Sequence, residues 1–416
     1  MTYIEFFDKS AIENICSCLV NAPDRVVLIG SQKKTLLSHA QRYHDLFLVK
    51  GVDIEFICKS VNKNNLQDIV DLLSEIVESY EDCVFDLTGG DELMLVAVGI
   101  VYYRYRDMDI QMHRFNLRSN VLYDCDKDGK DIPIDNLPEL SVQENIRLYG
   151  GKVVFEDEKP GASYRWDWTA DFIDDIRNIW DICKRDVRAW NTQIGVFAAA
   201  EELSDKTSPL VTTVSMPKIS EYLKNFSAKY VEIKRIIREL QDHGLLFFED
   251  SEEDVISITY KNEQVKRCLI KAGQALEMKI TLAAMLAHDK SGDHVYSDVM
   301  NGVYIDWDGN IHTEQDGYDT ENEIDVMIMH GMIPVFVSCK NGMIDIDELY
   351  KLSAVADKYG GKYAKKVLIA TALGSKDHFA MYLRQRAQDM NIRLIENIQK
   401  TTEEDLERLI GSLWCN

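Results

Sequence analysis

Proline, long apolar runs and positive charge are all scarce in this chain of 416 residues, and each shortage excludes a class of protein. Only 7 residues are proline and 46% are hydrophobic, a composition that excludes collagen-like repeats and wholesale disorder. The longest apolar run, Leu93–Tyr103, is interrupted by Gly99 and is shorter than the roughly 20 residues that cross a bilayer. We therefore expect a globular protein with no membrane partner.

The start of the chain and its cysteines lack other familiar signals. Residues 1–10 have no basic start, no long apolar stretch and no small-residue cleavage site, so we expect no secretory signal and a cytoplasmic protein. The 9 cysteines include no C-x-x-C pair and match no zinc spacing. Buried free thiols are expected rather than a zinc site.

Basic residues are outnumbered, because 47 lysines and arginines stand against 70 aspartates and glutamates, and the formal net charge is −23. Such a chain repels a polyanion at long range, so any contact with nucleic acid must be local. At roughly 100–200 residues per domain, the length predicts two or three domains.

Residues 1–150 alternate short β-branched runs with amphipathic helical patterns, which is typical of a parallel sheet with crossover helices. The pattern predicts a Rossmann-like domain that ends near residue 150. Its expected strands include Arg25–Gly30, Val52–Cys58 and Cys83–Leu87, and its expected helices include Thr35–Leu48 and Asn65–Tyr80.

Residues 151–272 are mostly helical in pattern. Gly244 then gives a helix-stop signal, and Leu245–Phe248 and Val255–Ile258 follow as a hairpin pattern. Helices followed by a two-stranded wing are typical of a winged-helix module, and a helical connector with one hairpin fits the pattern equally well. The expected helices are Asp171–Trp190, Ile219–Phe226 and Tyr230–His243.

Strands and helices alternate again in residues 273–416. The expected fold class is therefore α/β, with a Rossmann-like domain, a helical or winged-helix-like connector and a second α/β domain. The elements expected in the second α/β domain include the helix Gln274–His288 and the strands Val295–Val303, Glu323–Met329 and Val335–Lys340.

Two of these strands flank a short turn. Gly331 and Met332 fit a two-residue hairpin loop, with glycine at the first central position of a type II′ turn. His330 then pairs with Ile333, and the rest of the register follows by counting.

Counting back from the turn places Asp325 opposite Ser338 and Glu323 opposite Lys340. Side chains two apart on a strand share a face, so these four polar groups project from one side of the hairpin. Cys339 projects from the other side with apolar neighbours, and we expect it in the core rather than as a nucleophile.

Two carboxylates beside a lysine suit phosphodiester hydrolysis. The carboxylates can hold a hard divalent cation, and the ammonium of Lys340 can position water and stabilise charge that develops at phosphorus. The other interpretation is an edge hairpin with a solvated charged face and an Asp–Lys cross-strand pair. We favour the catalytic interpretation, because the flanking strands are strongly apolar.

Asp325, an apolar hairpin and then Lys340 resemble the PD-(D/E)xK superfamily of restriction-endonuclease-like nucleases. In that superfamily an upstream helix often supplies a further acid. The resemblance implies that role for Glu277, in the helix before the first strand of this domain. It also implies a restriction-endonuclease-like α/β fold for residues 273–416 and a metal held by Glu277 and Asp325.

The second metal ligand of this family is open here. Many members carry an acid two residues before the lysine, where this chain has Ser338. Glu323 on the same face, the Ser338 hydroxyl and the backbone carbonyl of Cys339 are the candidates.

The stretch Phe85–Glu92, which reads FDLTGGDE, ends a strand and opens a helix. It resembles the signature of CARF domains, the sensors of cyclic oligoadenylates in type III CRISPR immunity. A hydroxyl and close backbone N–H groups at a helix N-terminus form an anion site, and open α/β sheets bind ligands at the carboxyl ends of strands. The expected ligand contacts are Thr88, Gly89 and Gly90, then Gly30, Ser31, Gln32 and Lys33 after an earlier strand, with Asn14 as a further candidate.

Over its whole length the chain resembles the CRISPR ancillary nucleases, which join a CARF sensor to a restriction-endonuclease-like effector. The resemblance implies a homodimer that binds cyclic tetra-adenylate through residues 1–150 and then cuts DNA or RNA with Mn²⁺ or Mg²⁺. Residues 151–272 would connect the two parts.

A function from a different class remains open. The chain can instead be a non-enzymatic, ligand-responsive transcription regulator, with the winged-helix-like connector as its DNA-binding part and a degenerate nuclease domain. Ser338, in place of an acid, keeps this alternative open.

Overall fold

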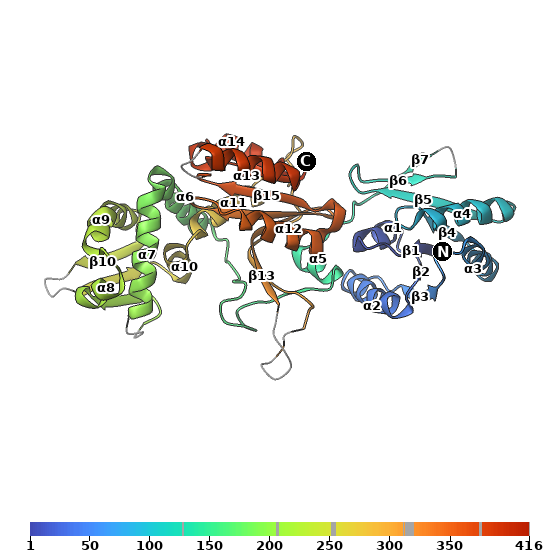
Figure 1. Cartoon of the computed structure of the whole chain (residues 1–416), viewed down its shortest axis with the longest axis horizontal. Coiled ribbons are helices and arrows are strands. Elements are labelled where there is room, and N and C mark those ends of the chain that lie inside the picture. The colour runs from blue at the N-terminus through green and yellow to red at the C-terminus, as the bar shows by residue number, and fades with distance from the viewer. Residues whose placement is uncertain are drawn as a thin grey trace.

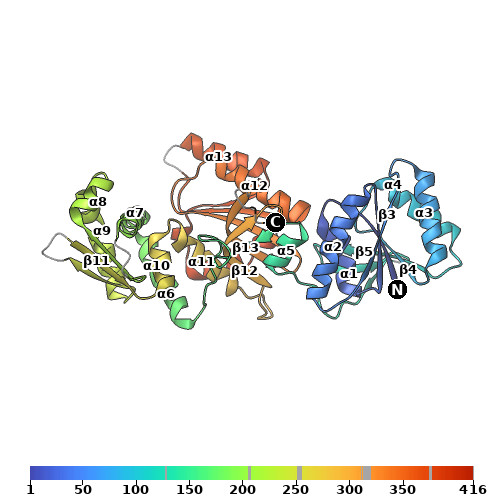
Figure 2. The same ribbon diagram turned by 90° about the horizontal axis from the view of Figure 1, so that it is seen from below.

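The structure is a computed structural model that describes residues 1–126, 129–204, 208–250, 255–310, 312, 320–373 and 377–415. These residues form three sheets spread along the longest axis of the molecule (Figure 1). The N-terminal sheet lies at one end, the sheet of the middle residues at the other, and the C-terminal sheet between them, as the view from below also shows (Figure 2). The chain therefore runs from one end of the molecule to the other and returns to the centre.

The N-terminal sheet has seven strands in the order β3-β2-β1-β4-β5-β6-β7. Neighbours from β3 through β5 are parallel, and the last two pairs are antiparallel. This arrangement confirms the Rossmann-like expectation. The strands are β1 (Thr2–Phe6), β2 (Arg25–Gly30), β3 (Glu55–Ser60), β4 (Cys83–Asp86), β5 (Ile110–Asn116), β6 (Val121–Asp124) and β7 (Lys130–Ile132); the helices are η1 (Ala11–Asn14), α1 (Cys16–Asn21), α2 (Lys33–Val49), α3 (Leu66–Ser79) and α4 (Glu92–Arg104).

The middle residues fold as a winged helix, with a three-stranded antiparallel sheet in the order β10-β11-β9. The order helix–strand–helix–helix–strand–strand is that of a winged helix, and the three-stranded sheet is more than the single hairpin of the other interpretation. The turn between the wing strands includes residues 251–254, which lie outside the described residues. The elements are α6 (Ala170–Arg185), α7 (Val187–Leu203), β9 (Val211–Ser215), α8 (Met216–Tyr222), α9 (Phe226–Asp242), β10 (Leu246–Asp250), β11 (Val255–Tyr260) and α10 (Glu263–Ile270).

This module differs from the sequence prediction in several places, which include the unpredicted helix α10 and the bounds of α8 and α9. The single helix expected over Asp171–Trp190 is two helices, because the chain leaves helical geometry at Asp186. There the Asp186 side chain accepts a hydrogen bond from the backbone of Ala189 and caps a new helix that continues to Leu203. The short strand β9 was not predicted.

The C-terminal sheet has six strands in the order β16-β15-β14-β13-β12-β8. Its first strand along the chain, β8, precedes the winged helix, so the module interrupts the chain of this sheet. The elements are α5 (Val142–Leu148), β8 (Lys152–Val153), α11 (Gln274–Met285), β12 (Asp298–Asp306), β13 (Glu321–His330), β14 (Ile333–Lys340), α12 (Asp347–Gly360), η2 (Gly361–Tyr363), β15 (Lys365–Ala370), α13 (Asp377–Asp389), β16 (Ile392–Ile395), η3 (Ile398–Lys400), α14 (Glu403–Ile410) and η4 (Leu413–Cys415).

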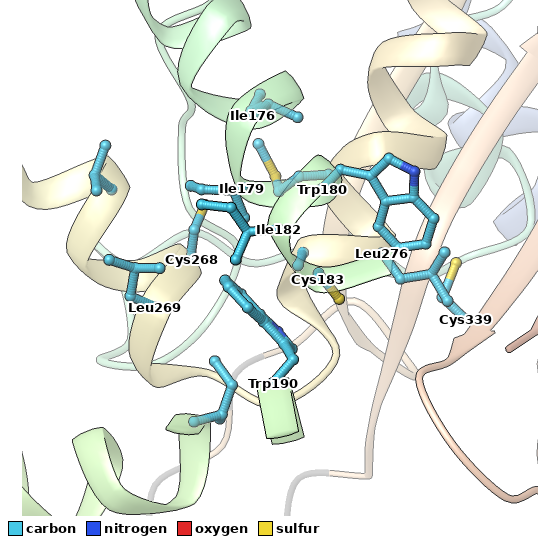
Figure 3. Close-up of a cluster of buried hydrophobic side chains, with 14 of the residues drawn as sticks. Ile176, Ile179, Trp180, Ile182, Cys183, Trp190, Cys268, Leu269, Leu276 and Cys339 are labelled. Atoms are coloured by element: carbon cyan, nitrogen blue, oxygen red, sulfur yellow. The ribbon is translucent and has the colours of Figure 1, made fainter. Parts of the chain in front are cut away.

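One apolar core joins the winged helix to the C-terminal sheet (Figure 3). Trp180 of α6 and Trp190 of α7 are both buried in it, together with Leu276 of α11. Cys339 of β14 belongs to the same core, as its place on the apolar face of the hairpin predicted. The helix that carries Glu277 is therefore fixed between the connector and the sheet.

None of the helices in the described part of the chain has the length and apolar character that a membrane span requires.

Candidate active site

The β13–β14 hairpin has the register that the sequence predicted. His330 pairs with Ile333, and the ladder continues to the pair Val326 and Val337. Gly331 has a φ of +59°, the left-handed backbone that this tight turn requires and glycine tolerates. The turn therefore sets which side chains of the two strands face each other.

Beyond the ladder, Asp325 binds the end of β14. Its Oδ2 atom accepts hydrogen bonds from the backbone N–H of Cys339 at 2.6 Å and from the Ser338 hydroxyl at 3.1 Å. Lys340 Nζ lies 3.7 Å from the same oxygen. Ser338 is thus a hydrogen-bond donor that orients Asp325.

Lys340 also contacts an acid that sequence reasoning missed. Its Nζ lies 2.8 Å from Oε2 of Glu348, in the first turn of α12. Burial by itself lowers the pKa of Lys340, but the charge of Asp325 and the hydrogen bond to Glu348 raise that pKa above its ordinary value. The acids at the start of the helix that follows β14 were the available signal for this contact.

Glu277 approaches the hairpin from α11 and is only 5% exposed. Burial, and then the charge of Asp325, raise the pKa of Glu277 well above its ordinary value. Its Oε2 atom has no hydrogen-bond partner among the described residues. Gly273, with a φ of +82°, begins the helix so close that a Cβ there would lie 2.8 Å from Oε1 of Glu277.

Burial also raises the pKa of Asp325, although Lys340, the Cys339 N–H and the Ser338 hydroxyl act in the opposite direction. The carboxylates of Glu277, which is buried, and Asp325, which is partly buried, thus both resist ionisation. This is expected where nearby positive charge does not fully compensate two acids. This donor set attracts a cation.

These groups line one cavity of about 380 Å³. Glu323 also lines it, and its carboxylate lies 2.6 Å from Nζ of Lys271, a second cation that sequence reasoning missed. Burial lowers the pKa of Lys271, and the charges of Glu277 and Glu323 outweigh that effect and raise it. The residues brought together are Glu277, Glu323, Asp325, Lys340 and Lys271.

The fit of these residues to a divalent metal rests on their oxygen atoms. Three carboxylates line the cavity, and hard cations prefer oxygen ligands. The buried Oε2 atom of Glu277 has no hydrogen-bond partner among the described residues, which also fits a cation bound at this position. Among the described residues, no group of three or more His, Cys, Asp or Glu side chains is arranged closely enough to hold a metal by itself. The chemistry of the donors fits a hard cation, and a complete ligand shell needs water or substrate oxygens.

The expected ligand loops meet at the carboxyl ends of three adjacent strands, β2, β1 and β4. Gly30 ends β2, Ser31 and Gln32 follow it, and Lys33 is the first residue of α2. On β4's side, the Thr88 hydroxyl accepts a hydrogen bond from the backbone N–H of Phe115 at 2.8 Å. This bond ties the loop to the neighbouring strand β5.

Gly90 in this loop has a φ of +100°, and a Cβ there would lie 2.7 Å from Cβ of Phe6. Gly89 packs against the same strand end, where a Cβ would lie 3.3 Å from the carbonyl oxygen of Phe6. Both glycines let the loop after β4 approach the end of β1 closely, which leaves their backbone at the end of the sheet.

Asn14 is fully buried in η1. Its side chain accepts a hydrogen bond from the backbone N–H of Asp8 at 2.6 Å and donates to the Asp8 carbonyl at 2.9 Å and to the Tyr43 hydroxyl at 2.8 Å. In this conformation Asn14 shapes the segment after β1, and its polar atoms are occupied within the protein.

Two buried acids beneath these loops were not anticipated. Glu5 of β1 and Asp86 of β4 are both buried, on paired strands. Burial, and then the charge of Asp86, raise the pKa of Glu5 well above its ordinary value, and burial raises the pKa of Asp86. Glu5 in an otherwise apolar strand was the signal in the sequence.

No protein-family model matches the chain, and no curated protein matches it in sequence. Its fold is nevertheless similar to solved structures along the whole chain. The crystal structure of protein VC1899 from Vibrio cholerae is 16% identical with a TM-score of 0.75, and the match covers 100% of this chain and 98% of that one.

The structure of Can2 from Sulfobacillus thermosulfidooxidans in complex with cyclic tetra-adenylate is 15% identical, with a TM-score of 0.65 and coverage of 98% and 99%. A type III CRISPR defence DNA nuclease activated by cyclic oligoadenylate is 14% identical, with a TM-score of 0.47 and coverage of 90% of this chain and 46% of that one. The likeness to the third structure is too small to support an argument. At these identities, the first two show a shared α/β fold.

Proposed function

We propose that this chain is a metal-dependent nuclease that a cyclic oligoadenylate activates, similar to the CRISPR ancillary nucleases. The observation that carries the proposal is the convergence of Glu277, Asp325 and Lys340, from one helix and two strands, on a single cavity. In the proposed organisation, residues 1–150 are the sensor, residues 151–272 the connector and residues 273–416 the nuclease.

The proposed activator rests on likeness over the whole chain. Can2, whose fold this chain shares, is described in complex with cyclic tetra-adenylate. Here the loops after β1, β2 and β4 gather at one end of the N-terminal sheet, where open α/β sheets bind ligands. The proposed ligand contacts are Gly30, Ser31, Gln32, Lys33, Thr88, Gly89 and Gly90.

Glu277 and Asp325 would hold Mn²⁺ or Mg²⁺, with Glu323 as the third carboxylate. The bound metal would supply an acidified water and neutralise phosphate oxygens. Lys340 remains protonated, because neighbouring acids raise its pKa, and its ammonium stabilises charge that develops at phosphorus. Ser338 and the Cys339 N–H fix the direction of the Asp325 carboxylate.

In this mechanism Lys271 and the proposed metal compete for the carboxylate of Glu323. Its carboxylate now pairs with Lys271 at 2.6 Å, so it must turn or share its oxygens to reach a metal. A change of the Glu323 carboxylate from Lys271 to the metal would be one local difference between the inactive and active states. Activation requires that the ligand bind the active arrangement of the proposed cytoplasmic homodimer more tightly than the inactive one.

The test is cleavage by the full-length protein of single-stranded RNA, single-stranded DNA and supercoiled plasmid, with Mn²⁺ or Mg²⁺ and each ring size of cyclic oligoadenylate. We expect cutting only with metal and activator together. Asp325→Ala and Lys340→Ala should each lower the rate by about 100-fold or more, as the loss of a group that stabilises the transition state does. The exposed Lys400 provides the control variant Lys400→Ala, expected to cut normally. Undiminished cutting by both active-site variants would reject the site.

The winged-helix topology of the connector supports a second candidate function, a ligand-responsive regulator that binds duplex DNA. Sequence-specific duplex binding without cutting under any activator would favour this candidate over the nuclease.

A further inference from the structure

The candidate catalytic cavity continues into a second cavity of about 700 Å³. Asn191, Gly342 and Met343 line both, so the two cavities are adjacent along one surface. One wall of the second cavity comes from the winged helix, and the other from the segments that follow β14, β15 and β16. We refer to the two cavities together as the connector groove.

The winged-helix wall is a polar stripe of α7. Arg188, Asn191, Thr192 and Gly195 line the groove, at the spacing that places residues on one helix face. Trp190, between them in sequence, is buried on the opposite side, in the core shared with α11 (Figure 3). The same packing that fixes α11 therefore fixes this stripe beside the candidate active site.

The stripe is joined to the end of β14 by hydrogen bonds. Asn191 Nδ2 donates to the backbone carbonyl of Asn341 at 2.6 Å, and Asn341 Nδ2 donates to Asn191 Oδ1 at 3.1 Å. Asn341 directly follows Lys340. These bonds set the distance between α7 and the proposed catalytic lysine.

Two cations of the winged helix lie along the groove. Arg188 has a side chain that is 90% exposed, and its contact with Glu232 is a long one of 3.6 Å through Nε, which leaves the terminal nitrogens available for a ligand. Lys229, from the first turn of α9, lines the same cavity and forms no ion pair with any carboxylate of the described residues. Lys271 and Lys340 line the other end of the groove, together with the three carboxylates of the candidate metal site.

The opposite wall contains polar atoms that have no partner within the described residues. Thr371 is 2% exposed and its hydroxyl makes no hydrogen bond there, and Oε1 of Gln399 is likewise unsatisfied. Both residues line the cavity. Buried polar groups are nearly always paired, so these two indicate a ligand whose polar atoms complete them.

We propose that the connector groove binds the substrate strand beside the scissile phosphate, with Arg188 and Lys229 on its phosphates and Thr371 and Gln399 on its polar groups. Met343, 74% exposed at the junction of the two cavities, offers an apolar surface to a base or sugar. This inference rests on the proposed nuclease function and assigns part of the substrate contact to the connector.

A regulator that read duplex DNA would use a different surface of the same module. In a helix-turn-helix protein the recognition helix places its outward face in the major groove. On α9 that face includes the exposed residues Lys234 and Arg238, which do not line the connector groove. Variants on the two surfaces therefore separate the two modes of binding.

The experiment measures the binding of fluorescently labelled single-stranded and duplex oligonucleotides to the full-length protein by anisotropy, with activator and EDTA, so that no cleavage occurs. The Arg188→Glu/Lys229→Glu variant should bind the strand about tenfold more weakly or worse, and its slope of log affinity against log salt should be shallower by about 1.4, at about 0.7 per phosphate contact. The matched control, Lys234→Glu/Arg238→Glu, reverses the same number of charges on the outward face of α9 and should bind within twofold of wild type. Equal losses in the control and the groove variant, or no loss in the groove variant, would overturn the proposal.

A second measurement does not depend on the folding of a variant. Wild-type protein is crosslinked to oligonucleotides that carry 4-thiouridine or 4-thiothymidine, and the crosslinked peptides are identified by mass spectrometry. We expect crosslinks within residues 187–195 and at residues 342–343. Crosslinks confined to the outward face of α9 would overturn the groove and favour the duplex-reading mode.

Cleavage separates this inference from the function it rests on. If the wild type cuts, and the groove variant both binds and cuts like the wild type, the groove is wrong and the nuclease stands. If the wild type cuts nothing with any activator while the groove variant loses strand binding, the nuclease is wrong and the groove is a nucleic-acid site of another activity.

Discussion

Glu13 and Lys362 form an ion pair of 2.7 Å between the first and last parts of the chain. Glu13, buried in η1, also accepts a hydrogen bond from the Tyr363 hydroxyl at 2.8 Å. The segment η1 follows β1 at the ligand end of the N-terminal sheet, and η2 leads into β15, which pairs with β14 as far as Lys340. The pair therefore connects the proposed sensor to the proposed catalytic strand.

Glu13→Gln should weaken this connection without touching the active site. The amide keeps the shape and the hydrogen-bond acceptor for Tyr363 but removes the charge that holds Lys362. We expect the activator concentration for half-maximal cutting to rise by about fivefold or more, a typical size for coupling between sites. The activator-independent rate should not change.

The measurement is a titration of cleavage rate against cyclic tetra-adenylate, with Lys400→Ala as the control. Lys362→Met should match Glu13→Gln, and the double variant should be no worse than either single one, because the two residues act through one contact. An unchanged titration in both single variants would contradict the connection.

Glu348 should act as a positioning residue for Lys340. Glu348→Gln removes the charge 2.8 Å from the ammonium, so Lys340 is held less firmly, and we expect kcat to fall by about tenfold with KM within twofold. Lys351, which is 70% exposed and lies 3.1 Å from the same carboxylate, gives the matched control: Lys351→Ala should keep kcat within twofold. A normal kcat in Glu348→Gln would mean that Asp325 alone positions the lysine.

Ser338 should position Asp325 rather than bind metal. Ser338→Ala removes one hydroxyl donor and leaves the 2.6 Å bond from the Cys339 N–H, so we expect a loss of about three- to tenfold in kcat, the cost of one hydrogen bond. The Mn²⁺ concentration for half-maximal rate should stay within twofold. A large shift in that concentration would instead identify the hydroxyl as a metal ligand. Ser227→Ala on the exposed face of α9 is the control.

The buried acid Glu5 should make the stability of the protein depend on pH. Because burial and Asp86 raise its pKa, the folded protein holds a proton on Glu5 that the unfolded chain releases above about pH 4.3. Raising the pH from about 4.3 towards the raised pKa of Glu5 in the folded protein therefore favours unfolding. Glu5→Gln mimics the protonated acid and should flatten the dependence.

The check is thermal unfolding between pH 5 and pH 8 in EDTA. We expect the Tm of the wild type to fall with pH, and the Tm of Glu5→Gln to exceed it at pH 8 by on the order of 2–4 °C, which corresponds to roughly 1 kcal/mol in a domain of this size. Parallel curves for the two proteins would show that Glu5 is already ionised in the fold.

The parts of the site that the sequence predicted are those set by local geometry. A two-residue turn at Gly331 fixes the hairpin register, so counting placed Asp325 near Ser338, and the two side chains form a hydrogen bond just beyond the paired residues. Glu277 came from resemblance to a known nuclease pattern, and the structure places it in the same cavity. Whether these residues catalyse cleavage stays a prediction.

The parts that were missed depend on packing between distant elements. Lys271 lines the cavity from the end of α10, and Glu348 contacts Lys340 from the start of α12. No spacing rule connects either residue to the hairpin. The break at Asp186 was missed because the apolar period continues through it. The polar stripe of α7 was missed because the expected helix ended at Trp190, before Asn191, Thr192 and Gly195.

The place of β8 in the C-terminal sheet affects how the protein is made. Val153 pairs with Ile305, and the whole winged helix is translated between them. Since domains fold as they emerge from the ribosome, the module can form first while β8 waits for its partner strand. Until β12 has been made, the backbone N–H and C=O groups of β8 have no partner strand. Unpaired strands of this kind are prone to pair with other chains.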